Sequence, residues 1–330
     1  MKLASLKSKE RDGELVIVNK ALTHYISAHS VAPTLQNAIE NWQTAGDALI
    51  ALYQQLNTDI TQGEELDPKN LNSPLPRAYQ WLDGSAYLTH VERVRKARGA
   101  EMPPSFLHDP LMYQGGSDYF LPPLSPVYAG DEAWGIDFES EIAVITDDVP
   151  QGVSVEKAGQ HIKLIMLVND VSLRNLIPGE LAKGFGFVHG KPPTAFSPVA
   201  VTPNELGDKW QDHKVHLPLL THLNQELFGQ PNAGEDMQFS FAELIHHAAK
   251  TRPLSAGTII GSGTVSNADL STGCSCLAEK RVLEIIESGE ASTPFLRFGD
   301  HVHIEMFNEH NESIFGAVSQ TIKPYERDNG

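Results

Sequence analysis

Three acidic residues in one short segment have the spacing expected of a metal-binding strand. Residues 135–145 alternate apolar and polar side chains before a final apolar run, which predicts a β-strand. Residues i and i+2 of a strand point to the same face, so Asp137, Glu139 and Glu141 are expected on one side. Neighbouring carboxylates repel one another, and a hard divalent cation such as Mg²⁺ or Ca²⁺ would relieve that repulsion. A solvated acidic strand face is the alternative at this point, because acidic residues are mostly exposed.

Two further motifs contain carboxylates that could join such a site. Asp83 precedes His90 by seven residues; the aspartate could bind a cation and the histidine could act as a general base near neutral pH. Asp170 ends an apolar strand, where the strand holds a carboxylate rigidly and the next loop gives access to it. Arg174 follows four residues later, a spacing that one helical turn would close. The alternatives are a structural histidine and a helix N-cap aspartate with a surface arginine.

Basic and glycine-rich segments could bind an anionic substrate. A basic cluster follows His90, and arginine pairs well with carboxylates, although a helix surface with scattered cations has the same pattern; the cluster is Arg93, Arg95, Lys96 and Arg98. Lys191 follows the segment 184–190, whose spacing does not match a phosphate-binding loop and indicates no nucleotide site. The turn 261–266 exposes backbone N–H groups and the hydroxyl of Thr264, which suits carboxylate or oxyanion binding.

The elements that position these residues belong to a β-rich chain. Strands are predicted where short apolar segments lie between Gly- and Pro-rich turns: 14–18, 134–146, 164–169, 199–201, 214–222, 258–260, 281–286, 301–307 and 313–318. Helices are predicted from Thr34, over the stripe Leu49, Leu52 and Leu56, and at 155–161 and 241–250. The polar segment 61–70 suggests a linker, so we expect a small N-terminal α+β domain over 1–75 and a second domain over 76–330. The predicted class is α+β and β-rich, with a large mixed sheet and helices outside it.

Composition limits the possible partners and location. The 330 residues are 41% hydrophobic and 20% charged, as in a globular protein with a substantial core. A formal net charge of −17 argues against nucleic acid, because phosphate binding needs clustered Lys and Arg. No signal peptide and no membrane-length apolar run is visible. Cys274 and Cys276 are too close for an ordinary disulfide, so we expect reduced thiols in a cytoplasmic protein.

Taken in order, these motifs resemble the fumarylacetoacetate hydrolase family over roughly residues 75–325. The matching segments are 83–90, 113–115, Asp-Phe-Glu-Ser-Glu at 137–141, Asn-Asp-x-Ser-x-Arg at 169–174, Gly-Lys at 190–191 and Gly-Ser-Gly-Thr-Val-Ser at 261–266. The resemblance implies a mixed β-sheet roll or barrel of the fumarylacetoacetate hydrolase type. A small N-terminal domain is similar to that of the two-domain fumarylacetoacetases. The order of several motifs carries more weight than any one of them.

The resemblance also implies a role for each matching residue. Ligands for Mg²⁺ or Ca²⁺ would be Asp83, Glu139, Glu141 and Asp170, with Asp137 outside the coordination shell. Catalytic groups would be His90, its partner Glu279, Lys191 and Arg174, where Glu279 and Lys191 match after small shifts in spacing. Substrate contacts would be Arg98, Tyr113 and Thr264. Ile177 stands where the family's fumarylacetoacetases have glutamine, so the resemblance leaves the exact substrate open.

The implied reaction is hydrolysis of a carbon–carbon bond in a β-diketone acid. The nearest match is fumarylacetoacetate, cleaved to fumarate and acetoacetate in tyrosine and phenylalanine catabolism. Acylpyruvate hydrolysis, decarboxylation or hydration of a 2-oxo acid, and oxaloacetate processing are alternatives on the same scaffold, as is a non-catalytic metal-stabilised binding protein. The presence of both His90 and Glu279 favours hydrolysis, because a decarboxylase needs no activated water. The expected partners are a small dicarboxylate or oxo-acid substrate and a second copy of the chain in a homodimer.

Overall fold

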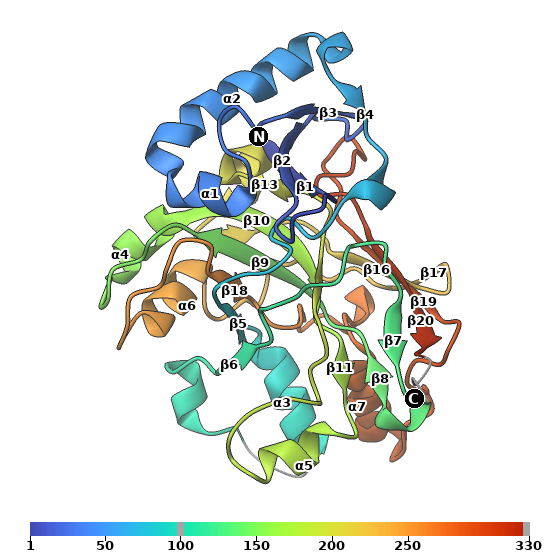
Figure 1. Ribbon diagram of the computed structural model, residues 1–330. Helices are drawn as coiled ribbons and strands as arrows, with labels where there is room; N and C mark the ends of the chain where they lie inside the picture. Colours follow the sequence, from blue (N-terminus) through green and yellow to red (C-terminus); the bar gives the residue numbers. More distant parts are fainter. Residues whose placement is uncertain (98–101, 326–330) are drawn as a thin grey trace, which may run out of the picture.

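The chain folds around one long mixed β-sheet with a smaller sheet beside it (Figure 1). The computed structural model describes residues 1–97 and 102–325. Within these residues the long sheet has 11 strands. In spatial order they are β4 (Glu64–Glu65), β3 (His24–Ser27), β2 (Glu14–Val18), β1 (Lys2–Leu6), β13 (Ala200–Val201), β10 (Ile162–Asn169), β9 (Ser140–Thr146), β18 (Ile259–Gly261), β5 (Trp81–Gly84) and β6 (Met112–Gly115), with β12 (Ala195–Phe196) paired to β10.

The smaller sheet lies on one side of the long one in Figure 1. Its strands are β17 (Glu226–Gly229), β16 (Leu220–Leu223), β19 (His301–Glu305), β20 (Val318–Pro324) and β7 (Val127–Ala129). Two short ladders pair β8 (Ile136–Asp137) with β11 (Ser172–Leu173), and β14 (Trp210–Gln211) with β15 (Lys214–Val215).

Helices lie at both ends of the molecule and beside the middle of the long sheet (Figure 1). They are α1 (Leu35–Glu40), α2 (Trp42–Thr58), α3 (Leu88–Ala97), α4 (Val155–Ala158), α5 (Ile177–Leu181), α6 (Phe241–Ala248) and α7 (Leu277–Ser288). Short 3₁₀ turns cover Ile60–Gln62, Pro68–Asn70, Pro104–Leu107, Glu132–Trp134, Gly159–His161, Pro203–Lys209 and Leu270–Thr272. In Figure 1, α1 and α2 lie with β1–β4 at the upper end, α3, α5 and α7 lie at the lower end, and α4 and α6 lie beside the middle of the long sheet. No helix among the described residues is long and apolar enough to cross a bilayer.

The central strands are buried on both faces. In β10, Leu164 and Met166 belong to the apolar cluster that contains Leu35 and Leu49 of α1 and α2. Ile165, which points to the other face, belongs to a second cluster. A strand covered on both faces has a continuous apolar sequence rather than an alternating one, which explains the composition of β10. This core holds the middle of the long sheet rigidly.

The structure confirms the predicted fold class, an α+β, β-rich protein with a mixed sheet and a small N-terminal α+β portion. The first helix begins where predicted, because the hydroxyl of Thr34 accepts the N–H of Asn37. β1 pairs with both β2 and β13, so the N-terminal strands extend the sheet that contains β10 and β9. A domain division after residue 75 stays a prediction.

Two predicted strands are wrong. Residues 281–286 lie within helix α7, whose first turn is capped by the sulfur of Cys276 and whose end is capped by Gly289 at φ 90°. The apolar and β-branched residues of this segment resemble a strand, but the caps permit a helix that packs on α3. Residues 313–318 form no strand beyond a single bridge between Phe307 and Ser313, and the strand begins instead at Val318.

The predicted strand 134–146 is interrupted at residues 138 and 139. β8 ends at Asp137 and pairs with β11, whereas β9 begins at Ser140 and pairs with β10 and β18. The chain therefore changes its pairing partner between the two strands. Glu139 lies in the interruption, next to β9 rather than within one regular ladder.

Candidate functional site

Four carboxylates converge at the centre of the long sheet. They belong to Asp83 in β5, Glu139 before β9, Glu141 in β9 and Asp170 just after β10, and one oxygen from each lies within 4.8 Å of the others. The strand register explains this convergence. Asp83 pairs with Gly261 of β18, whose other neighbour is β9, and Glu141 pairs with Val168 of β10. All four side chains are buried, so this is not a solvated acidic face.

The unpaired state of Glu141 makes this cluster a fitting site for a divalent cation. Both of its carboxylate oxygens are buried without a hydrogen-bond partner among the described residues. Burial and the charge of Asp83 raise the pKa of Glu141 well above its usual value. Burial and the charge of Asp170 do the same to the pKa of Asp83. Oxygen ligands of this kind are those that Mg²⁺, Ca²⁺ and Mn²⁺ take in proteins, so the four carboxylates could hold such an ion.

Two cations offset part of the negative charge. Lys191 Nζ lies 2.6 Å from Glu139 Oε2 and 2.6 Å from Asp170 Oδ2. Arg174 Nη2 donates to Glu139 Oε1 at 2.7 Å, and its Nε donates to Asp137 Oδ2 at 2.8 Å. Burial alone would raise the pKa of Glu139, but Lys191 and then Arg174 hold it well below its usual value. Glu139 is therefore an ionised member of the cluster.

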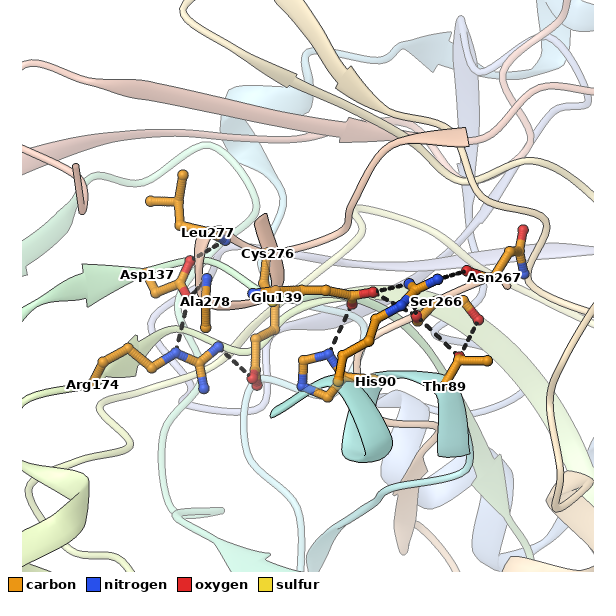
Figure 2. Close-up of polar contacts among 12 residues, drawn as sticks. Thr89, His90, Asp137, Glu139, Arg174, Ser266, Asn267, Cys276, Leu277 and Ala278 are labelled. Carbon is orange, nitrogen blue, oxygen red and sulfur yellow. Dashed lines mark hydrogen bonds and ion pairs between the residues drawn. The ribbon is translucent and has the colours of Figure 1, made fainter. Parts of the chain in front are cut away.

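Arg174 is not where the spacing argument placed it. One helical turn would have brought it back to Asp170, but residues 172 and 173 form strand β11. The pairing of Ser172 with Asp137 sends Arg174 toward Asp137 and Glu139 instead. Asp137 lies outside the four-carboxylate cluster and accepts the backbone N–H groups of residues 277 and 278, as Figure 2 shows.

A histidine–carboxylate pair faces the cluster from two helices. His90 lies in α3, and its Nδ1 is 2.8 Å from Oε2 of Glu279 in the first turn of α7. The side chain of Glu279 is fully buried, whereas that of His90 is 18% exposed. His90 lines a cleft of about 190 Å³ together with Asp83, Glu139 and Glu141. Drug-sized ligands occupy sites of roughly 300–1,000 Å³, so this cleft suits a smaller molecule.

Two of the three residues expected to contact substrate lie at the cleft, and their role stays a prediction. Tyr113 and Thr264 line the cleft, and the Tyr113 hydroxyl donates to Asp170 Oδ2. Arg98 lies outside the described residues. The glycine turn helps to orient one carboxylate of the cluster, since the Gly263 N–H donates to Asp83 Oδ1 at 3.0 Å. Ile177 and Phe187 add apolar surface to the cleft.

A loop closed at its base presents Lys191 to the cluster. The carboxylate of Glu180, at the start of the loop, accepts the N–H groups of three residues at its end, 188, 189 and 190. Lys191 follows directly. The tip carries Phe185, whose side chain is 99% exposed, and Phe187, whose ring packs on Tyr113 with centroids 5.1 Å apart. The loop therefore has a fixed base and an exposed tip beside the cleft.

The sequence did not identify several supporting residues. Thr194 donates its hydroxyl to Asp170 Oδ1 at 2.7 Å, and Ser266 donates to Glu279 Oε1 at 2.7 Å. Thr194 lies three residues beyond Lys191, and Ser266 ends the glycine turn, so proximity to a motif was the available signal. Cys276, for which the sequence suggested no role, caps α7 through its sulfur. Both cysteines are free and buried.

Replacing Gly261 with alanine should weaken divalent-metal binding. A Cβ at this position would overlap Asp83 Oδ1 and the Trp81 ring. Overpacking costs about 1–3 kcal/mol, and disturbing the support of a ligand lowers metal affinity about 10–100-fold. Thermal unfolding with and without Mg²⁺ measures both effects. Gly46→Ala, whose Cβ would meet only Trp42 at 3.6 Å, is the control. Unchanged metal affinity in Gly261→Ala would contradict this account of the site.

Comparison with known proteins gives matches along most of the chain. A family model described as "Fumarylacetoacetate (FAA) hydrolase C-terminal" matches residues 80–323, and one described as "Fumarylacetoacetase N-terminal domain 2" matches residues 1–77. Oxaloacetate tautomerase YisK of Bacillus subtilis (strain 168) is 28% identical over 246 residues, which cover 72% of this chain and 70% of the relative.

Two solved structures show the same fold at low identity. A fumarylacetoacetate hydrolase from psychrophilic Exiguobacterium antarcticum has a TM-score of 0.65 at 15% identity, covering 98% of this chain and 100% of that one. A maleylpyruvate hydrolase from Sphingobium sp. SYK-6, solved in complex with manganese(II) and pyruvate, has a TM-score of 0.64 at 14% identity, covering 99% and 100%.

Proposed function

Because this chain belongs to the fumarylacetoacetate hydrolase family, we propose that it hydrolyses a carbon–carbon bond in a β-diketone acid, with fumarylacetoacetate as its substrate. The observation that carries this proposal is the arrangement of the cleft. His90, backed by the buried Glu279, opens into the same small cleft as the four-carboxylate cluster. A base with an ionised partner is what activation of water requires.

The metal site rests on the residues already described. Asp83, Glu139, Glu141 and Asp170 would hold a divalent ion, which when bound supplies Lewis-acid polarisation of a substrate carbonyl. Mg²⁺ and Ca²⁺ are the ions proposed from the sequence. Mn²⁺ joins them, because it accompanies pyruvate in the Sphingobium maleylpyruvate hydrolase structure.

The proposed chemistry assigns a separate task to each group. Glu279 accepts the Nδ1–H of His90, so Nε2 can take a proton from water as its oxygen attacks the carbonyl carbon. The carbon–carbon bond then breaks, its electron pair remains on the leaving enolate, and the proton held by His90 passes to that carbon. Lys191 and Arg174 stabilise the charge that develops on oxygen. Arg174 lines the cleft, and its Nη1 makes no hydrogen bond to the described residues.

Tautomerisation of oxaloacetate is the second candidate. The 28% identity to oxaloacetate tautomerase YisK favours it, and oxaloacetate processing is one of the alternatives raised by the sequence. The same groups could serve, since His90 could move a proton between the carbon and the enol oxygen of a 2-oxo acid. Tautomerisation breaks no carbon–carbon bond and consumes no water, so the products distinguish the two reactions.

Removal of metal provides the first test of either function. Prolonged treatment with a chelator should reduce turnover to background, and added Mg²⁺, Ca²⁺ or Mn²⁺ should restore it. The assay follows the ultraviolet absorbance of fumarylacetoacetate, an acylpyruvate and oxaloacetate in parallel, with the products identified by chromatography. Cleavage of fumarylacetoacetate above the other two supports the first proposal. Turnover of oxaloacetate alone would replace it with the second, and full activity after chelation would exclude a metal role.

Further expectations accompany the proposal. Tyr113, Thr264 and Arg98 would hold the substrate carboxylates, and the family enzymes suggest a place in tyrosine catabolism, in the cytoplasm and as a homodimer. These assignments rest on the sequence resemblance. Ile177 lines the cleft, so the position where the family's fumarylacetoacetases have glutamine faces the proposed substrate.

A further inference from the structure

The carboxylate of Glu279 binds more groups than His90. Its Oε1 accepts hydrogen bonds from Arg93 Nη1 and from the Ser266 hydroxyl, while its Oε2 faces His90. Arg93 also donates from Nη2 to the carbonyl oxygen of Asn267 at 2.7 Å. The network joins three segments, α3, residues 266–268 and the first turn of α7. In Figure 2 the labelled partners His90, Ser266 and Asn267 lie together, apart from the contacts around Arg174.

Helix α3 places Arg93 one turn after His90. Residues i and i+3 lie on the same helix face, so the two side chains reach opposite oxygens of one carboxylate. Arg93 is not among the described residues that line the cleft, and its side chain is 13% exposed. It therefore touches neither the proposed substrate position nor the carboxylate cluster.

We propose that Arg93 is a positioning residue of the reaction proposed above, acting on His90 through Glu279. Arg93 and Ser266 fix Oε1, so Oε2 has one orientation and takes the Nδ1–H of His90. This fixes the imidazole tautomer and leaves Nε2 free to accept a proton in the cleft. Without Arg93 the carboxylate can rotate, and the ring loses its single orientation and tautomer.

Electrostatics support the same arrangement. A fully buried carboxylate without a cation is strongly destabilised, and it lowers that cost by taking up a proton. Burial raises the pKa of Glu279, but hydrogen bonds from His90, Ser266 and Arg93 outweigh it and hold the pKa below its usual value. Glu279 is therefore an acceptor, not a proton donor, at neutral pH. A protonated Glu279 could instead donate a hydrogen bond to Nδ1, which would favour the Nε2–H tautomer of His90 and leave no free acceptor in the cleft.

The kinetic test is a double-mutant cycle with Glu279. Arg93→Met should lower kcat about 10–100-fold, as loss of an outer-shell partner commonly does, with KM within about twofold of the parent value. Arg93→Lys should restore part of the loss, because a single charge still reaches Oε1. In a Glu279→Gln background, Arg93→Met should have no further effect on kcat. An equal loss of kcat in both backgrounds would overturn the proposal.

Arg281→Met is the matched control for a merely structural role. Arg281 lies in α7 two residues after Glu279, but its guanidinium binds the carbonyl oxygen of Thr293 and packs on the Phe295 ring. This variant should lower the melting temperature and leave kcat unchanged. The positioning role is wrong if Arg93→Met and Arg281→Met, at a similar loss of melting temperature, show a similar loss of kcat. Ser266→Ala, which removes the other bond to Oε1, should give a smaller loss in the same direction if Arg93→Met fails to fold.

A spectroscopic readout separates this inference from the proposed substrate. Nitrogen-15 NMR of histidine-labelled protein reports which ring nitrogen carries the proton, and a His90→Gln difference spectrum assigns the signal. At a pH where the ring is neutral, the parent should show the Nδ1–H tautomer and Arg93→Met should show a mixture. An unchanged tautomer in Arg93→Met would overturn the inference even if fumarylacetoacetate is turned over. A changed tautomer would uphold it even if the substrate proves to be another oxo acid.

Discussion

Replacing His90 with alanine should lower turnover by about 10²–10⁴-fold, the usual contribution of a positioned general base. His90 is outside the four-carboxylate cluster, so the variant should still bind a divalent cation. The two properties are measured separately, turnover by the absorbance assay and metal binding by the rise in melting temperature on adding Mg²⁺, Ca²⁺ or Mn²⁺. Loss of catalysis with retained metal binding would assign the base role to His90.

The control for this variant is His29→Ala, an exposed histidine in the N-terminal portion. It should match the parent in turnover and in metal binding. The turnover of Glu279→Gln should lie between those of His90→Ala and His29→Ala. The glutamine amide can still face His90, but it lacks the charge that stabilises the protonated ring. Full activity of His90→Ala would remove the base from the mechanism and return the assignment to another group in the cleft.

Replacing Glu141 with glutamine should abolish the stabilisation that a divalent cation gives. An ion present at about 100 times its dissociation constant stabilises the folded state by roughly 2.7 kcal/mol, and the variant should gain almost none of it. Without metal, the same substitution should stabilise the folded protein instead of weakening it. Both oxygens of Glu141 are buried without a hydrogen-bond partner among the described residues and lie beside three other carboxylates. A neutral glutamine removes the cost of either ionising or protonating this carboxyl group, so it should raise the melting temperature of the metal-free protein.

Glu226→Gln, at an exposed position in β17, is the control for the loss of one carboxylate. It should leave both the metal-free melting temperature and the metal-induced shift unchanged. A Glu141→Gln variant that keeps the parent's metal-induced shift would show that the cluster binds no ion through this residue. A lower melting temperature without metal would show that Glu141 contributes packing or pairing beyond the contacts described.

The residues of the site were easier to predict than their contacts. Asp83, Glu139, Glu141 and Asp170 could be grouped because the motifs that contain them follow one another in the order that resembles the fumarylacetoacetate hydrolase family. Their meeting depends on β18, which lies between β9 and β5 in the sheet. Pairing of strands more than a hundred residues apart leaves no local signal, so the sequence could suggest the set of ligands but not the register that joins them.

Local reasoning failed where two structures have similar periodicity. The apolar residues of 281–286 fit a strand as well as a helix, and the deciding groups are the cap at Cys276 and the packing of α7 on α3. Local spacing also gave the wrong position for the side chain of Arg174. Its four-residue separation from Asp170 suggested a helical turn, whereas the pairing of β11 with β8, distant in sequence, determines its partners.

The loop that Glu180 closes has a consequence for how substrate range could change during evolution. Three backbone N–H groups bound to one carboxylate hold the loop's base, and Lys191 follows that base directly. At the tip, Phe185 is exposed and Phe187 lines the cleft, and neither side chain takes part in those bonds. Substitutions or insertions at the tip can therefore accumulate without moving Lys191. Selection could reshape what enters the cleft while the reacting groups keep their geometry, so new substrates need not be gained at the expense of the existing chemistry.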